Sequence, residues 1–92
     1  MDENKIIITV SGADKVGIVA GITAVLARVK VNIEDIKQTL MQGHFVMFML
    51  CNISQSNSSF KEIKEALTKC GEEMGMEIWV QKKEIVDNMH KI

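Results

Sequence analysis

The sequence lacks the features that mark several common classes of protein. It contains a single arginine, Arg28, and its 11 basic and 12 acidic residues give a net charge of −1. Without an excess of positive charge the chain has no surface to hold a phosphate backbone, so we expect no nucleic-acid partner. No apolar run approaches the ~20 residues that span a bilayer. The polar residues 1–5 lack the basic region and long apolar segment of a signal peptide, which predicts a cytoplasmic protein without a membrane partner.

Cysteine and histidine are too sparse for a metal or redox motif. Cys51 and Cys70 lie far apart and form no CxxC motif. We therefore predict two buried thiols in a reducing compartment, with a disulfide or redox pair as the alternative. His44 and His90 form no paired-histidine metal motif, and the chain has neither a Ser-His-Asp order nor a phosphate-cradling loop. The sequence predicts no metal, no cofactor and no enzymatic activity.

The length of 92 residues is sufficient for one domain and too short for two. We treat residues 1–92 as a single domain, with a core of about residues 5–83 and a helical tail of about residues 84–92 that docks on its own domain or on a partner. Alternation predicts strands at Lys5–Ser11, from Val31 to Leu40 or Met41, at His44–Ile53 and at Met76–Lys82. Helical spacing predicts helices from Asp14 or Val16 to Arg28 and from a capping box at Ser59 to Glu73 or Met74. Gly71 or Gly75 is expected to end the second helix in a left-handed cap.

The second and third strands differ in character. In the second, Ile33 and Ile36 are out of alternating phase between polar residues, which predicts a bulge or a late start of the strand. A polar, irregular strand of this kind is expected at the edge of the sheet. Gln42-Gly43 supplies a hairpin turn. The third strand is the most apolar segment, so we expect it to be buried on both faces. Because two helices cover only one face of a sheet, this strand indicates self-association.

The order strand-helix-strand-strand-helix-strand predicts an α+β fold of the ferredoxin-like βαββαβ type. We expect a four-stranded antiparallel sheet covered on one face by two helices, with a short additional helix at the C-terminus. Right-handed crossovers place the first and third strands at the centre and the second at an edge.

The segment Ser11–Gly21, between the first strand and the first helix, is the candidate functional site. Gly12 permits a positive φ or a close backbone approach, and Asp14 is suited to cap the helix. Gly17 removes a side chain near helix amides that favour a carboxylate. Asn32 offers a donor and an acceptor, and we expect it near the same end of the sheet. The alternative is a capped turn without a ligand.

The motif Gly12-x-Asp14-x-x-Gly17-Ile18-Val19, followed by Val31-Asn32-Ile33, resembles the signature of the ACT domain over about residues 5–83. The stretch Asp35-Ile36-x-Gln38-Thr39 is similar to that of small stand-alone ACT-domain proteins. This resemblance implies a regulatory ligand-binding protein whose domains pair side by side and bind amino acids or other small metabolites at subunit interfaces. The residues that it implies for ligand binding are Gly12, Ala13, Asp14, Val16, Gly17 and Ile18, together with Asn32 and Ile33 of the same or the adjacent subunit.

Two hypotheses follow from the sequence. The first is a homodimer, or a higher homo-oligomer, that senses an amino acid or a related carboxylate metabolite at its interface. The second is a ligand-free protein–protein interaction module that assembles through its sheet and its C-terminal tail.

Overall fold

The computed structural model describes residues 4–89, and the order of its elements confirms the predicted βαββαβ fold with an additional C-terminal helix. The elements are β1 (Lys5–Ala13), α1 (Ile18–Arg28), β2 (Asn32–Met41), β3 (His44–Asn52), α2 (Phe60–Met74), β4 (Glu77–Lys82) and α3 (Lys83–Met89). Of the tail predicted at about residues 84–92, residues 90–92 lie outside the described residues. Within the described part of the chain, no helix is long and apolar enough to cross a membrane.

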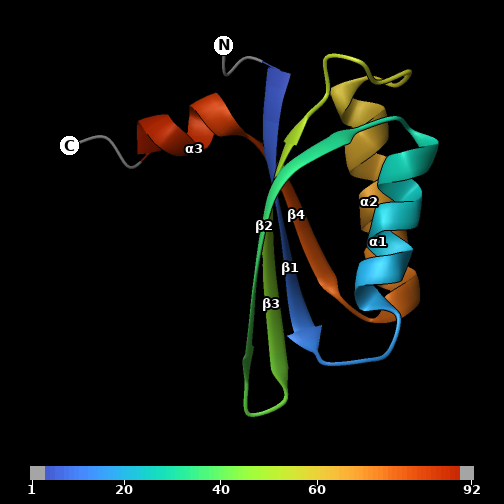
Figure 1. The fold of residues 1–92 in the computed structure, drawn as a ribbon, viewed down its shortest axis with the longest axis vertical. Coiled ribbons are helices and arrows are strands. Elements are labelled where there is room, and N and C mark those ends of the chain that lie inside the picture. The colour runs from blue at the N-terminus through green and yellow to red at the C-terminus, as the bar shows by residue number, and fades with distance from the viewer. Residues whose placement is uncertain (1–3, 90–92) are drawn as a thin grey trace.

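The four strands form one antiparallel sheet in the order β2-β3-β1-β4. The two most apolar strands, β1 and β3, occupy its centre, and the polar β2 lies at an edge, as predicted. Figure 1 shows the sheet nearly edge-on, with α1 and α2 on one side and α3 on the other. We call the side opposite α1 and α2 the open face. The fold is therefore ferredoxin-like, with two helices covering a single face of the sheet.

The core lies between the sheet and the two covering helices. Alternate residues of β1 point into it, because successive side chains of a strand face opposite ways. Its contributors include Ile6, Ile8 and Val10 from β1, Ile22 and Leu26 from α1, and Ile63 and Leu67 from α2. Cys51 and Cys70 are free thiols and both are buried, which confirms the predicted buried thiols; the reducing compartment stays a prediction.

Strand β2 has the predicted irregularity. Its register against β3 shifts between Ile33 and Asp35, which confirms the bulge. Gln42 and Gly43 connect it to β3 with φ angles of 50° and 83°. Positive φ at both central residues is the pattern of the type I′ turn that suits a hairpin. The hairpin is thus set by local turn chemistry.

The ends of α2 also confirm their sequence signals. The Ser59 side chain accepts a hydrogen bond from the backbone N–H of Glu62, whose carboxylate accepts one from the N–H of Ser59. These reciprocal bonds form the capping box. At the other end, Gly75 closes the helix in the left-handed region with a φ of 70°, as expected for a glycine cap.

In the single chain β3 is buried on one face only, so burial of its other face stays a prediction that depends on self-association. The residues of β3 that face the helices, Phe45, Met47, Met49 and Cys51, are all buried. On the open face, Phe48 has 49% of its surface exposed. The physical reason is that α1 and α2 lie on the same side of the sheet (Figure 1), and among the described helices only the short α3 lies on the other side.

Candidate functional site

The loop between β1 and α1 covers residues 14–17, further along the chain than predicted, and is held at both ends. Strand β1 continues to Ala13, which pairs with His44 at the start of β3. The next backbone N–H, that of Asp14, donates to the carbonyl oxygen of Gly43 in the hairpin turn at 2.9 Å. On the other side, Lys15 Nζ donates to the carbonyl oxygen of Met74 at the end of α2 at 2.6 Å. An ammonium group is favourable there, because the carboxyl end of a helix carries partial negative charge.

Helix α1 begins at Ile18 with Gly17 at the N-cap position, so the prediction that Asp14 caps the helix is wrong. The extended pairing of β1 keeps Asp14 with the hairpin, too far back in the chain to cap. Gly17 has a φ of 90°, and no side chain bonds to the first amides of the helix. The N–H of Gly21 donates to the carbonyl oxygen of Gly17, which leaves the first three N–H groups of the helix without intrahelical partners.

The space around these amides is open. A Cβ atom built on Gly17 would have no heavy atom within 4 Å. Val16 is fully exposed, at 105% of its reference surface, and Ala13 and Asp14 are also exposed. Uncapped donors beside a small, solvent-exposed loop are an arrangement that can bind a carboxylate.

Two of the predicted site residues serve packing. Ile18 is only 2% exposed and belongs to the core. Gly12 allows a close approach, because a Cβ at that position would lie 2.7 Å from Sδ of Met76. The loop therefore presents Ala13, Asp14, Val16 and Gly17 to solvent, and Gly12 and Ile18 support it from behind.

Asn32 and Ile33 lie at the opposite end of the sheet from this loop, so the prediction that they share one end within the chain is wrong. Asn32 pairs with Asn52, which in turn pairs with Lys5 at the start of β1. The loop follows the other end of β1. The reason is directional: α1 runs back along β1, so β2 starts where β1 started.

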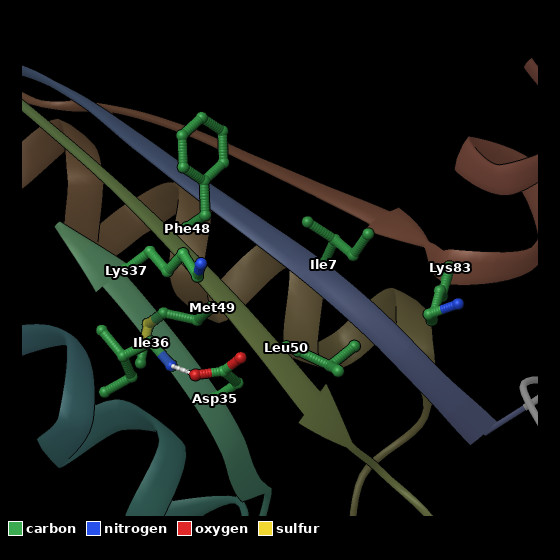
Figure 2. A pocket seen from close by; sticks show the side chains of 8 residues that line it. All are labelled: Ile7, Asp35, Ile36, Lys37, Phe48, Met49, Leu50 and Lys83. Carbon is green, nitrogen blue, oxygen red and sulfur yellow. Dashed lines mark hydrogen bonds between the residues drawn. The ribbon is translucent and has the colours of Figure 1, made fainter. Parts of the chain in front are cut away.

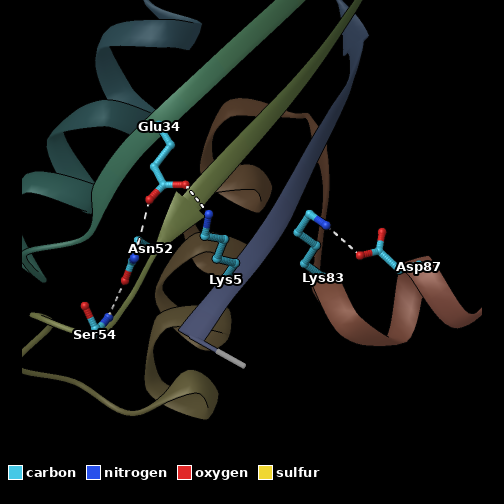
Figure 3. A network of polar contacts seen from close by, with 6 residues as sticks. All are labelled: Lys5, Glu34, Asn52, Ser54, Lys83 and Asp87. Atoms are coloured by element: carbon cyan, nitrogen blue, oxygen red, sulfur yellow. Dashed lines mark hydrogen bonds and ion pairs between the residues drawn. The ribbon is translucent and has the colours of Figure 1, made fainter. Parts of the chain in front are cut away.

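The end of the sheet that carries Asn32 is closed by a polar network (Figure 3). Lys5 Nζ lies 3.0 Å from Oε1 of Glu34, and Nδ2 of Asn52 donates to its Oε2 at 3.3 Å. The bond from Lys5 is the main cause of the lowered pKa of the Glu34 carboxyl. These contacts hold the bulge of β2 against β3 and β1.

Sequence reasoning missed one polar pair next to the loop. Ser11 Oγ and His44 Nε2 are 2.9 Å apart at an exposed position. The signal was available, because a hairpin turn at Gln42-Gly43 places His44 beside the end of β1 once β1 and β3 are taken as neighbours. Among the described residues, no group of three or more His, Cys, Asp or Glu side chains could hold a metal ion.

The second missed feature is a shallow hollow on the open face, which we call the open-face hollow (Figure 2). Its volume is about 270 Å³. Its floor is apolar, because Ile7 of β1 pairs with Leu50 of β3, and Phe48 stands in the next row. Asp35 and Lys37 of β2 border it on one side and Lys83 of α3 on the other.

The structure defines a small domain of the ferredoxin-like class, and comparison with known proteins identifies its family. The model of the ACT domain matches residues 4–81. The chain therefore belongs to the ACT domain family.

Relatives of similar length are known from bacteria and archaea. A UPF0237 protein of Listeria innocua is 48% identical over 86 residues, which cover 94% of this chain and 97% of the relative. A UPF0237 protein of Methanococcus maripaludis is 49% identical over 87 residues, which cover 95% and 97%. The match thus extends over nearly the whole of each protein.

Solved structures agree with the fold. An ACT domain protein from Streptococcus pneumoniae superposes with a TM-score of 0.78 at 32% identity, over 96% of both chains. The regulatory subunit of aspartate kinase from Thermus thermophilus superposes with a TM-score of 0.67 at 24% identity, over 88% of this chain and 52% of that chain. At that identity the second likeness shows the fold alone.

Proposed function

We propose that this protein is a cytoplasmic regulatory sensor that binds a small amino-acid-like carboxylate at the interface of a homodimer. Its role in this proposal is regulatory rather than catalytic. The observation that carries the proposal is the N-terminus of α1, which has no side-chain cap and lies in an open glycine loop. A carboxylate there would accept hydrogen bonds from the free amides and gain from the helix dipole. Membership of the ACT domain family supports the same reading.

The interface part of the proposal rests on the edge strand β2. Ile36 pairs with Met49, and Leu40 pairs with Phe45. The side chains of Ile36 and Leu40 therefore point to the side of the sheet that carries the helices. They are nevertheless 37% and 58% exposed. Apolar side chains on the helix side of an unpaired edge would be covered if the sheet continued into a second copy.

Antiparallel pairing of β2 with β2 of a second copy would also complete the pocket. A two-fold axis at the middle of β2 brings Asn32 of one copy to the level of Met41 of the other. Met41 pairs with His44, and His44 with Ala13. Asn32 and Ile33 of the second copy would therefore reach the end of the sheet where the loop of the first copy lies. The pocket in this proposal is shared between subunits.

Titration of the purified protein with the twenty amino acids and simple carboxylates, followed by calorimetry and thermal unfolding, tests the proposal. A ligand present at 100 times its dissociation constant adds about 2.7 kcal/mol to the free energy of unfolding. For a domain of this size, that gain corresponds to a rise in Tm of roughly 10–20 °C.

Two binding variants locate the site. Gly17→Asp brings a carboxylate to the same amides, and aspartate tolerates positive φ better than most residues. Asn32→Ala removes the polar group of the second wall. We expect each variant to lose the Tm shift, and a mixture of the two to regain part of it, because one site of a mixed dimer is intact. Asn57→Ala, an exposed asparagine in another loop, is the control. The proposal fails if no compound shifts Tm or if the mixture does not complement.

A further inference from the structure

The open face of the sheet carries a continuous set of apolar side chains. Trp79 of β4 and Phe48 of β3 lie in one row, on either side of Thr9, and each is 49% exposed. The next row holds Leu50 and Ile7, over which the open-face hollow lies. Solitary exposed apolar residues are ordinary, but a contiguous apolar patch indicates an interaction surface.

Helix α3 projects from this same face. It contacts β1 and β4 near its start, and Figure 1 shows it extending away from the sheet on the side opposite α1 and α2. Ile85 on this helix is 51% exposed. Lys83 and Asp87 form an ion pair at 2.5 Å along it. A helix of 7 residues has little stability of its own in water. We call α3 the arm, and its projection from the sheet implies a further surface against which it packs.

We propose that a second copy of this chain closes the open face, with α3 of each copy reaching across to the open-face hollow of the other. The two sheets would stack face to face, independently of pairing through β2. This interface goes beyond the proposed ligand pocket and does not depend on it.

The positions of arm and hollow fit such a dimer. Strand β4 ends at Lys82, which pairs with Ile6, so α3 leaves the sheet on the β4 side at the level of the hollow. The hollow extends toward β2 at that level, where Asp35 pairs with Leu50. Consider a two-fold axis that runs parallel to the strands, over the boundary between β1 and β3. It places the β4 side of one sheet opposite the β2 side of the other and leaves the position along the strands unchanged. The axis therefore brings each arm to the other copy's hollow, as a self-complementary interface requires.

The dimensions agree as well. Stacked sheets lie ~10 Å apart, and a helix of 7 residues is also ~10 Å long. The arm thus spans the distance between the two sheets. The sheet face alone measures ~30 Å along β1 by ~19 Å across the strands, a footprint of roughly 600 Å². A stable interface needs about 800 Å² per partner, and the arms supply the remaining contact.

The charges of the two surfaces are complementary. Lys37 borders the hollow and is exposed, and the described part of the chain offers it no ion pair. Glu84 is exposed on the arm and likewise forms no ion pair with a described residue. The dimer would bring the arm of one copy to the Lys37 side of the other, where opposite charges favour association.

The chain contains one tryptophan, Trp79, and its emission reports on this face directly. We expect the emission of the wild-type protein to shift to shorter wavelength as the protein concentration rises, because stacking removes the indole from water. Sedimentation velocity over the same concentrations should show the corresponding increase in mass. In Ile85→Asp, a charge on the exposed face of the arm should abolish the emission shift and halve the mass of the largest species.

Leu40→Asp is the matched control, since it makes the same kind of change at an exposed aliphatic residue on the helix side of β2. We expect it to preserve the Trp79 shift while it disrupts association through β2, so failure of one interface is distinguishable from failure of the other. Circular dichroism verifies that both variants are folded. The proposal is overturned if Trp79 emission is independent of concentration, if the wild-type chain remains monomeric, or if Ile85→Asp associates and shifts like the wild type.

Discussion

At the residue scale, a thiol in the core has a strongly raised pKa. Cys51 lies on the helix side of β3 with no exposed surface. Burial raises its pKa to about 12, with a smaller contribution from the charge of Glu34. An apolar environment disfavours the thiolate, so this cysteine is a packing residue and a poor nucleophile at neutral pH.

The raised pKa makes the stability of the fold depend on alkaline pH. In the unfolded chain the thiol titrates near 8.5, whereas the native thiol keeps its proton up to about pH 12. Between these values the unfolded state binds fewer protons, so the free energy of unfolding falls as pH rises, by up to about 1.4 kcal/mol per pH unit. Urea unfolding in a series of buffers from about pH 8 to about pH 10 measures this slope.

Cys51→Ala is the comparison for that prediction. This substitution lowers the free energy of unfolding at every pH because it leaves a cavity. It also removes one group whose pKa differs between the folded and unfolded states. We expect a shallower dependence on alkaline pH than in the wild type, with Cys70, whose pKa burial also raises, supplying part of what remains. Parallel curves for the two proteins would contradict the assignment.

Individual residue roles were predictable where they depend on near neighbours in the sequence. The capping box of Ser59 and Glu62 and the left-handed cap at Gly75 are local patterns, and both are present. Asp14 illustrates the opposite case. Whether it caps α1 depends on where β1 ends, and that point is fixed by pairing between Ala13 and His44, far apart in the sequence.

At the scale of elements, helix α2 packs against β4 through a glycine. A Cβ atom on Gly71 would lie 2.8 Å from the carbonyl oxygen of Met76 and 2.9 Å from Cγ1 of Ile78. Neither neighbour is the far end of a flexible side chain. The close contact between this helix and the strand that follows it therefore requires glycine.

Gly71→Ala should destabilise the protein. Alanine favours a helix over glycine by about 1 kcal/mol, but overpacking a tight contact typically costs about 1–3 kcal/mol. The backbone carbonyl of Met76 cannot move without shifting the start of β4. We expect a net loss of up to about 2 kcal/mol in the free energy of unfolding, measured by urea denaturation.

Gly21→Ala in α1 is the matched substitution. There the added Cβ would lie 3.0 Å from Sδ of Met74, and a methionine side chain can adopt another rotamer. We expect this change to be neutral or stabilising, by up to about 1 kcal/mol through helix propensity. If both alanine variants lose stability equally, the close contact at Gly71 is not the cause.

The placement of elements was largely evident in the sequence pattern. The polar, out-of-phase residues of β2 indicated an edge strand with a bulge, and the register shift after Ile33 confirms it. The separation of Asn32 from the glycine loop was misjudged, although it follows from the element order alone. Because α1 runs back along β1, β2 starts at the same end of the sheet as β1.

At the scale of the whole molecule, the two proposed interfaces predict a stability that depends on concentration. Association that requires the folded state shifts the unfolding equilibrium by mass action. We expect the Tm of the wild type to rise with protein concentration. The double variant Leu40→Asp, Ile85→Asp removes both proposed interfaces, and differential scanning calorimetry should find its Tm independent of concentration.

The ferredoxin-like fold and the family were predictable because the strand and helix periods, the turn and the glycine motif all indicate the same architecture. The open-face hollow and the projecting arm were not. Phe48 and Trp79 read as apolar strand residues, and only the three-dimensional arrangement shows that they share an uncovered face with the start of α3. The surplus of apolar residues in β3 was the sequence signal that something should cover them.

The strand order has a consequence for synthesis on the ribosome. Strand β1 emerges first, yet its partners are β3 and β4, and β4 is complete only at Lys82. Pairings between distant segments form slowly, because a long loop must close before they yield contacts. Until then the apolar segment of Ile6, Ile7 and Ile8 has one or both of its strand edges unpaired. Segments of this kind promote aggregation. A nascent chain interrupted before β4 would keep that hazard, which ends only when β4 pairs with the second edge of β1.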